Sequence, residues 1–355
     1  MLEYLYKEGV VVTDLNRWED YLASFASDLR LWLDPLKCNA FYDSLLVSEN
    51  KMYEPSPVES LKSIKNPVEI EYECRVMPYD GAALCRLFRW IEKRLDENIP
   101  LREAEVAAKI AAIRSKHPAY LCESFEAIVG YGANGAVVHY HPGAGRDAEL
   151  EKDSLLLVDS GAHYIHGTTD ITRTVALGTP SGEMRRIFTL VLKGHIALAT
   201  AVFPEGTRGA QLDVLARQFL WREGLGYLHG TGHGIGYMLN VHEGPQNIRL
   251  QENPALLKPG MLLSNEPGYY KEGHYGIRCE NTLLVKEWGT TAFARFLCFE
   301  TISFYPFDRK LIDKELLTSF EAEWIDGYHQ RVFEVLSPLL DADESQWLRE
   351  KTKPL

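Results

Sequence analysis

Apolar residues recur at helical spacing over several long stretches of the chain, with polar residues between them. This spacing predicts helices over residues 15–29, 68–95, 103–115, 182–202 and 210–223, and in the tail from residue 313. Asn66 and Pro67 stand just before the second of these, as an N-cap followed by proline at the first helical position. Pro78 is expected to kink or interrupt that helix, because proline lacks the N–H that a helix uses.

Beyond Pro118 the pattern changes to short apolar runs, which are typical of strands. Strands are predicted over residues 127–129, 136–140, 154–159 and 168–177, and the stretch 224–304 is rich in glycine and strand-like runs. Near the N-terminus, residues 31–33 form a short apolar run that Pro35 ends, so a brief strand is expected there. The predicted fold class is α+β, with helices outside and a mixed or antiparallel sheet inside.

The chain has 355 residues, about twice the usual size of one domain, so more than one part is expected. Residues 51–57 carry two prolines and little apolar content, which marks a boundary. Residues 1–55 are therefore predicted to form a small αβ domain. Residues 56–305 are predicted to form the main domain, and residues 306–355 a helical C-terminal extension of it.

Charge and cysteine usage narrow the function classes. The chain has 38 Lys and Arg against 50 Asp and Glu, a net charge of −12, which argues against nucleic-acid binding. No run approaches the length of apolar sequence that a membrane span needs, and the first residues do not resemble a secretory signal. The six cysteines contain no C-x-x-C pair, so a reducing cytoplasm fits best. A soluble cytoplasmic protein without a membrane partner is expected.

A first pair of carboxylates stands at the ends of two predicted strands. If the hairpin turns at Tyr164 and Ile165, Asp159 and Asp170 lie directly opposite and point to the same face. Two carboxylates at that distance repel unless a cation or a proton lies between them. Solvated turn carboxylates are the alternative, but Asp159 follows four apolar residues, which favours a buried metal site.

Three histidines, His229, His233 and His242, lie within fourteen residues among four glycines, a density that packing alone hardly explains. Core histidines bonded to carbonyl groups remain the alternative. Glu266 and Glu280 each stand at the edge of an apolar strand. With the Asp pair and His233 they supply four carboxylates and one imidazole, which suit hard divalent ions such as Mn²⁺ and, less specifically, Co²⁺ or Zn²⁺. Four carboxylates also offset the charge of two such ions.

No other set of residues in the chain offers comparable chemistry. The sequence lacks G-x-S-x-G, H-E-x-x-H and a P-loop, and it has no G-x-G-x-x-G between a strand and a helix.

These five residues, in this order and with these neighbours, resemble the ligand set of the methionine aminopeptidase, prolidase and aminopeptidase P superfamily. The resemblance implies the pita-bread fold, which has a curved, mostly antiparallel sheet and outer helices. Six blocks are most similar to cytosolic aminopeptidase P, an Xaa-Pro aminopeptidase: Val138–Tyr140, Asp159–Gly161, Thr168–Thr174, His229–Gly236, Leu239–Pro245 and Asn265–Tyr270. The similarity covers about Ser56–Trp347.

The resemblance implies a role for each residue. Asp159 would chelate one ion, Asp170 and Glu280 would bridge two ions, and His233 and Glu266 would bind the other. A bridging hydroxide would attack, with Glu266 as general base. Substrate contacts would come from His139 and His242 at the scissile carbonyl and oxyanion, from His229 at the proline and from Arg278, with Tyr269 and Tyr270 as walls. Substrates would be peptides with proline second, and a homodimer is expected.

Three alternatives share parts of this pattern. Prolidase, which cleaves Xaa-Pro dipeptides, has the same ligands, although the longer spacing from His233 to His242 favours aminopeptidase P. A creatinase-like, metal-free hydrolase would need some ligands replaced, and all five stand here. A silent pita-bread binding protein is the third, because the subfamily carries complete N-terminal and middle domains. Residues 1–55 resemble only the remaining part of the middle domain, so reduced activity is expected.

Overall fold

The computed structural model describes residues 2–24, 29–46, 51–143 and 145–355, and these form two compact units. Unit 1 comprises Met1–Leu61 and unit 2 comprises Lys62–Leu355. The expected boundary near residue 55 and the interpretation of residues 1–55 as the remnant of a middle domain stay predictions. Within the described residues, every helix is too short or too polar to span a bilayer.

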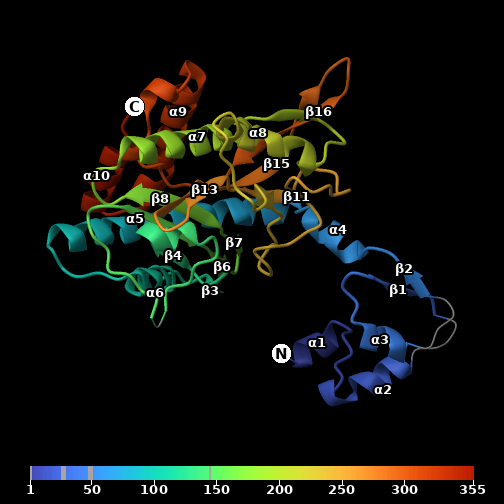
Figure 1. Ribbon diagram of the computed structural model, residues 1–355. Coiled ribbons are helices and arrows are strands. Elements are labelled where there is room, and N and C mark those ends of the chain that lie inside the picture. The colour runs from blue at the N-terminus through green and yellow to red at the C-terminus, as the bar shows by residue number, and fades with distance from the viewer. Residues whose placement is uncertain (1, 25–28, 47–50, 144) are drawn as a thin grey trace. The chain divides into compact units, whose positions relative to one another are not determined.

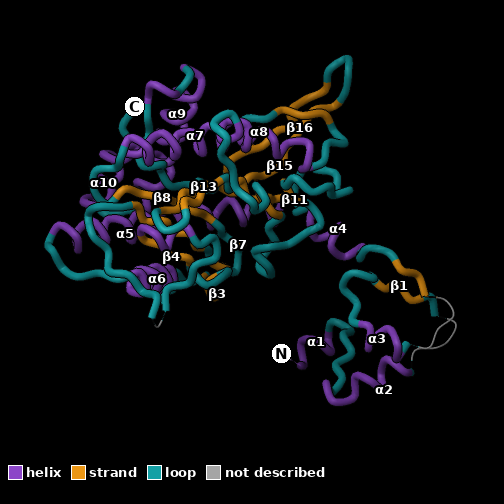
Figure 2. The backbone as a smooth tube through the Cα atoms, viewed as in Figure 1, coloured by secondary structure: helices purple, strands orange, loops and turns teal. Residues whose placement is uncertain are grey.

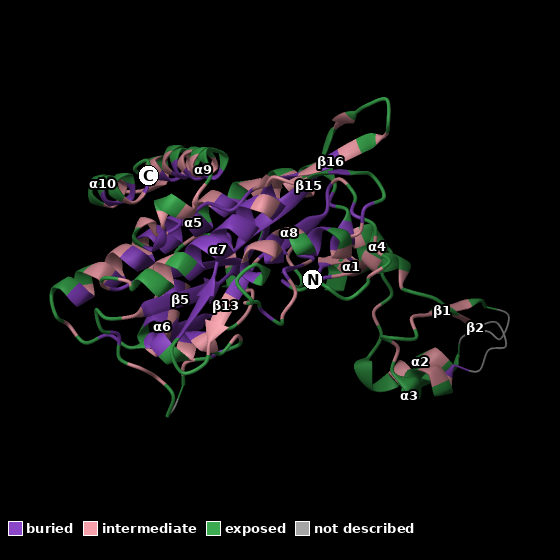
Figure 3. Ribbon diagram, turned by 45° about the horizontal axis from the view of Figure 1, so that its top comes forward, coloured by how far each residue is buried: buried purple, intermediate pink, exposed green. Residues whose placement is uncertain are grey.

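Unit 1 is built from short elements around little core (Figure 1). They are α1 Leu2–Lys7, a 3₁₀ turn Leu15–Arg17, α2 Trp18–Ala23, β1 Leu31–Leu33, α3 Ala40–Leu45 and β2 Lys51–Tyr53. Strands β1 and β2 pair in parallel, and Trp18 makes edge-to-face contacts with Phe41 and Tyr42. Of the described residues in this unit, only Leu46 is buried (Figure 3).

Unit 2 is entered through α4, Pro57–Ser63, which begins in unit 1. Its other helices are α5 Pro67–Asp96, α6 Glu103–Arg114, α7 Gly182–Ala199, α8 Gly209–Trp221, α9 Ser319–Leu336 and α10 Ala342–Lys351. Helix α5 packs against α6, α9 and α10, whereas α7 packs against α8 and along several strands (Figure 1).

The strands of unit 2 pair antiparallel throughout and gather between these helices (Figure 2). Three strands form the order β4–β5–β8: Ile128–Tyr131, Leu155–Ser160 and Ile171–Ala176. Four form the order β12–β15–β16–β9: Leu262–Asn265, Asn281–Thr290, Arg295–Thr301 and Val202–Pro204. Smaller sheets contain β3 Tyr120–Glu123, β6 Ala162–Tyr164 and β7 Gly167–Thr168; β10 Gly232–His233 and β11 Asn247–Ile248; and β13 Gly268–Lys271 and β14 Tyr275–Arg278.

The core of unit 2 follows the apolar runs of the sequence. Strand β5 is buried along its whole length, because it lies between β4 and β8 and packs on both faces. One cluster joins it to α5, α7 and the C-terminal helices, through residues such as Phe88, Leu156, Phe188 and Val332. The site strands are therefore held by a large apolar core.

The predicted helix over residues 68–95 is present as α5, with Asn66 as N-cap and Glu69 completing a capping box. Pro78 does not interrupt the helix, because α5 continues through it to Asp96, and a kink at Pro78 stays a prediction. Before the proline, Glu73 bonds to Thr168 of β7, and after it Asp80 bonds to Arg114 of α6, so tertiary contacts on both sides offset the lost hydrogen bond.

Two other predictions need correction. Residues 136–140 form no strand but a turn after the 3₁₀ segment Gly132–Ala136, in which Tyr140 N–H bonds to Val137 O. The buried Glu103 carboxylate, distant in sequence, accepts from Asn134 and the Tyr140 hydroxyl and fixes this turn. The helix predicted over residues 15–29 is divided into the 3₁₀ turn and α2, which ends at Ala23; residues 25–28 lie outside the described residues.

Candidate metal centre

Asp159 and Asp170 point to one face of the β4–β5–β8 sheet, but not as directly opposed partners. Asp159 of β5 pairs with Thr172 of β8, and Tyr164 pairs with Gly167. The hairpin therefore turns at Ile165 and His166, one residue later than predicted. Glu73 of α5 holds the turn in this register, because its carboxyl group accepts the N–H of Thr168 and lies against Gly167, where a Cβ would clash. Asp170 comes two residues before Thr172 and so shares its face.

Glu266 and Glu280 are brought together by the register of two strands. Asn265 ends β12 and lies opposite Asn281, which begins β15, so the two glutamates stand beside each other just beyond the strand ends. Backbone bonds hold both: Glu266 N–H donates to Thr231 O at 2.7 Å and Glu280 N–H to Thr172 O at 3.2 Å. The second bond joins this edge to β8, next to Asp170.

His233 completes the cluster from β10. Its Nε2 lies 3.2 Å from Asp170 Oδ2 and 3.6 Å from Glu266 Oε1. Asp170, His233 and Glu280 each offer a ligand atom, and these three atoms lie within 4.8 Å of one another. Asp159 is held beside them by Arg278, whose Nη2 donates to Asp159 Oδ2 at 2.6 Å.

The carboxylates of the cluster are buried close together, and this opposes their ionisation. Burial, and then the neighbouring carboxylates, raise the pKa of Glu280 well above its usual value. Burial likewise raises the pKa of Asp170, and it raises that of Glu266 to about 7. Burial alone would lower the pKa of His233, but its hydrogen bond to Asp170 and the charge of Glu266 raise it to about 9. The protein alone therefore does not compensate four carboxylate charges here.

The donor set fits divalent metal ions. Asp159 Oδ1 is buried and has no hydrogen-bond partner in the protein, so one ligand atom is left for a cation. Carboxylate oxygens with a single imidazole are the donors that hard divalent ions prefer. Asp159, Asp170, His233, Glu266 and Glu280 could together hold such ions.

Three further histidines surround the cluster. The rings of His242 and His233 meet edge to face with centroids 4.1 Å apart. His242 has an exposed surface, but the partial burial of its ring, together with the charge of His233, lowers its pKa to about 4. His229 Nε2 lies 2.9 Å from the Tyr270 hydroxyl, and burial lowers its pKa to about 3. His139 is exposed. The predicted substrate contacts of these histidines stay predictions.

Two family models match the chain in succession. The model of metallopeptidase family M24 matches residues 75–287, and that of the C-terminal region of peptidase M24 matches residues 295–355. The chain belongs to metallopeptidase family M24.

Its M24 relatives include Aminopeptidase P2 of Arabidopsis thaliana, 41% identical over 352 residues, which are 98% of this chain and 49% of that protein. A "Probable Xaa-Pro aminopeptidase P" of Tuber melanosporum is 47% identical over 307 residues, covering 84% of this chain and 50% of that protein. The chain thus spans about half the length of the curated relatives it matches.

Solved M24 structures confirm the predicted pita-bread fold. The X-prolyl aminopeptidase of Caenorhabditis elegans, described as a cytosolic enzyme with a di-nuclear active site, has 36% sequence identity and a TM-score of 0.94; the match covers 99% of this chain and 59% of that one. Prolidase of Pyrococcus furiosus has 25% identity and a TM-score of 0.65, covering 83% of this chain and 81% of that one.

Several residues of this M24 centre were missed by the sequence analysis. Thr172 Oγ1 donates to Glu280 Oε2 at 2.6 Å, and Ser264 Oγ donates to Glu266 Oε1 at 3.2 Å. Tyr270, predicted only as a wall, accepts from Arg278 Nη1 at 2.6 Å and so links Arg278 to His229. The alternation of side chains along a strand could have indicated both hydroxyl groups. Thr172 and Ser264 each stand two residues from a predicted ligand and so share its strand face.

Arg278 and Arg173 are buried and bind groups next to the predicted ligands. Arg278 was predicted as a substrate contact, a role that stays a prediction; its guanidinium is buried and engaged by Asp159 and Tyr270. The buried Arg173 has carbonyl and amide oxygens as partners, among them Glu280 O and Asn281 Oδ1 at 2.8 Å. Arg278 lies within the acidic cluster and partly offsets its charge, whereas Arg173 holds the backbone at Glu280.

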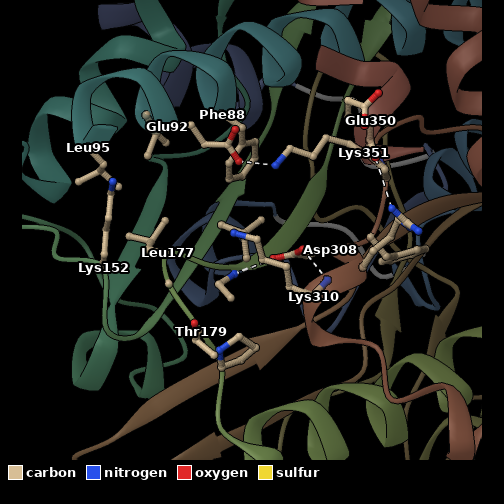
Figure 4. A pocket seen from close by; sticks show the side chains of 18 of the residues that line it. Phe88, Glu92, Leu95, Lys152, Leu177, Thr179, Asp308, Lys310, Glu350 and Lys351 are labelled. Atoms are coloured by element: carbon tan, nitrogen blue, oxygen red, sulfur yellow. Dashed lines mark hydrogen bonds and ion pairs between the residues drawn. The ribbon is translucent and has the colours of Figure 1, made fainter. Parts of the chain in front are cut away.

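A cavity of about 820 Å³ lies away from this centre, between α5, the end of β8 and α10 (Figure 4). None of the five predicted ligands is among the described residues that line it. Its charged side chains largely pair with one another, Lys351 with Glu92 at 2.5 Å and Lys152 with Asp96 at 2.7 Å. The cavity therefore lies outside the candidate metal centre.

Proposed function

We propose that the chain is the catalytic part of an Xaa-Pro aminopeptidase, which hydrolyses the bond between an N-terminal residue and a following proline. The observation that carries the proposal is the convergence of Asp170, His233 and Glu280 ligand atoms within 4.8 Å, beside Glu266 and Asp159. The names of its M24 relatives, aminopeptidase P and X-prolyl aminopeptidase, support the substrate class.

The residues would divide the work as follows. Asp159, Asp170, His233, Glu266 and Glu280 would hold two divalent ions, with Mn²⁺ the best fit and Co²⁺ or Zn²⁺ as alternatives. When bound, such ions lower the pKa of a water molecule and polarise the scissile carbonyl. Glu266 would take the proton of the attacking water at its carboxylate and pass it to the departing proline nitrogen.

The histidines would act on the substrate. His242, whose pKa of about 4 keeps it neutral at pH 7, would donate an N–H to the developing oxyanion, with His139 beside it. His229, oriented by Tyr270, would form part of the proline pocket. The proposal also includes a homodimer in the cytoplasm; the cytosolic description of the Caenorhabditis elegans relative supports the location.

The test is a cleavage assay on three peptides, Arg-Pro-Pro, Arg-Ala-Pro and the dipeptide Arg-Pro, with and without added Mn²⁺. We expect release of arginine from Arg-Pro-Pro alone, dependent on Mn²⁺ and abolished in Glu266→Gln. Elemental analysis should give two ions per chain, and light scattering should give twice the chain mass. Cleavage confined to Arg-Pro would assign prolidase, and bound metal without any cleavage would assign a binding protein.

A further inference from the structure

The position of His242 depends on the loop that carries it, residues 234–246. The residue is exposed, its ring has the His233 ring as its aromatic neighbour, and no hydrogen bond holds it among the described residues. Leu239, near the middle of the loop, is 61% exposed. A surface loop of this kind needs anchors if it is to present one ring to a reaction within a fraction of an ångström.

The first anchor comes from the linker between α4 and α5. Lys65 is only 3% exposed, and its ammonium donates to the carbonyl of Ile235 at 2.5 Å. The backbone of the linker is fixed in turn, because Lys65 N–H donates to Gly260 O at 2.9 Å. Breaking the bond to Ile235 would leave a buried donor without this partner, so the bond ties the start of the loop to the linker.

The second anchor lies at the other end of the loop. Lys62 Nζ lies 2.9 Å from Oε2 of Glu243, the neighbour of His242, and Glu243 is 7% exposed. The contact is an ion pair without the alignment of a hydrogen bond, so it acts through the attraction of the two charges. The Glu243 carboxylate packs over the start of the same loop, since a Cβ on Gly236 would fall 2.7 Å from its Oε2. Glu243 N–H also donates to Gly234 O at 2.8 Å.

We propose that Lys62 and Lys65 are positioning residues that hold this loop and, through it, His242 over the acidic cluster. The effect on catalysis through His242 rests on the proposed function, whereas the anchoring of the loop does not. Three amides report on the loop: Gly236 N–H bonds to Asn240 O, Met238 N–H to Thr168 Oγ1, and Glu243 N–H to Gly234 O.

Hydrogen exchange followed by mass spectrometry tests the structural part. Lys62→Met should raise the exchange rate of the peptide spanning residues 236–243 about tenfold, with metal content unchanged, and Lys62→Arg should restore it. Lys286→Met is the matched control, because Lys286 and Glu300 form an ion pair of the same 2.9 Å length on another sheet. Lys65→Met is a second variant, and if it folds, the same increase in exchange is expected. If it does not fold, the result for Lys62→Met alone tests the inference.

Steady-state kinetics in two backgrounds test the link to His242. In the otherwise native chain, Lys62→Met should lower kcat about tenfold and change KM little. A tenfold loss is smaller than the loss of about 10²-fold that a 1 Å misplacement of a catalytic group can cause. In a His242→Ala background the same change should have no further effect, because it acts through that ring.

Equal losses of kcat in both backgrounds, or unchanged exchange in the loop, would overturn the inference. A native chain that cleaves no Xaa-Pro peptide would instead overturn the proposed function and leave the exchange result to decide the role of the lysines.

Discussion

At the residue scale, the centre is a set of carboxylates whose burial opposes their own ionisation. Glu266, Glu280 and Asp170 all have raised pKa values because water is excluded and each faces the others. The buried Arg278 nearby supplies only part of the opposing charge. Bound cations would therefore stabilise the ionised form of the site.

Asp170→Asn should separate charge from shape at this site. The amide keeps the volume of the carboxylate but removes one charge from the predicted bridging position, so one ion should be lost. We expect turnover to fall by more than 10³-fold with the unfolding free energy of the metal-free protein unchanged or higher. Metal analysis and urea unfolding provide the measurements, and two retained ions with native turnover would remove Asp170 from the ligand set.

A second pair of variants distinguishes ligand from substrate histidines. His233 touches Asp170 and Glu266, whereas His242 touches only the His233 ring among these groups. His233→Ala should lower metal content, while His242→Ala should preserve it and lower kcat by roughly 10²–10³-fold. Stoichiometry measured on both proteins is decisive, since equal metal loss would show that the assignment is wrong.

At the element scale, α5 contributes more than a core face. Its Glu73 side chain is buried and accepts the N–H of Thr168, so the helix sets the turn that leads to Asp170. Burial raises the pKa of Glu73 to about 8, although the hydrogen bond from Thr168 opposes the change. The folded protein thus prefers the protonated side chain at neutral pH.

Glu73→Gln should flatten the dependence of stability on pH. Because the folded pKa of Glu73 is raised from 4.5 to about 8, its contribution is complete below pH 4.5 and is lost as the pH rises to 8. The contribution of Glu73 to the free energy of unfolding should change by at most about 5 kcal/mol between these pH values. Urea unfolding of the metal-free wild type and variant at pH 5 and pH 8 gives the comparison, and parallel losses in both proteins would contradict it.

Elements with local signals were predictable, and those fixed by distant contacts were not. Asn66, Pro67 and a regular apolar face define α5 within one residue at each end. Residues 136–140 carry a strand-like pattern but form a turn. The turn is held by hydrogen bonds to the Glu103 carboxylate, which lies more than thirty positions away in the sequence. The turn before Asp170 likewise depends on Glu73, so the pair of aspartates was expected on the correct face but in the wrong register.

At the scale of the whole molecule, the order of the ligands was visible in the sequence but their geometry was not. Which oxygen of each carboxylate faces its neighbours depends on strand register, on Arg278 and on hydroxyl groups such as Thr172. All five predicted ligands lie in unit 2, together with its apolar clusters. Folding and metal binding of unit 2 should therefore not require unit 1.

Limited proteolysis should reveal this division. Unit 1 has a parallel two-stranded sheet and a single buried residue among those described, and so small a core gives little resistance to local unfolding. Unit 2 combines an extensive core with the anchored segment that begins at Lys62. Trypsin at low concentration should therefore cut first at basic residues before Lys62, such as Lys37 and Lys51.

The expected product is a fragment that retains residues 62–355, two metal ions per chain and the thermal midpoint of the untreated protein. Intact mass spectrometry identifies the cut, elemental analysis counts the ions and calorimetry gives the midpoint. A matched digestion without added metal should still cut first in unit 1, because that preference comes from the core and not from the ligands. First cuts inside unit 2, or release of metal when unit 1 is removed, would show that the two units are stabilised together.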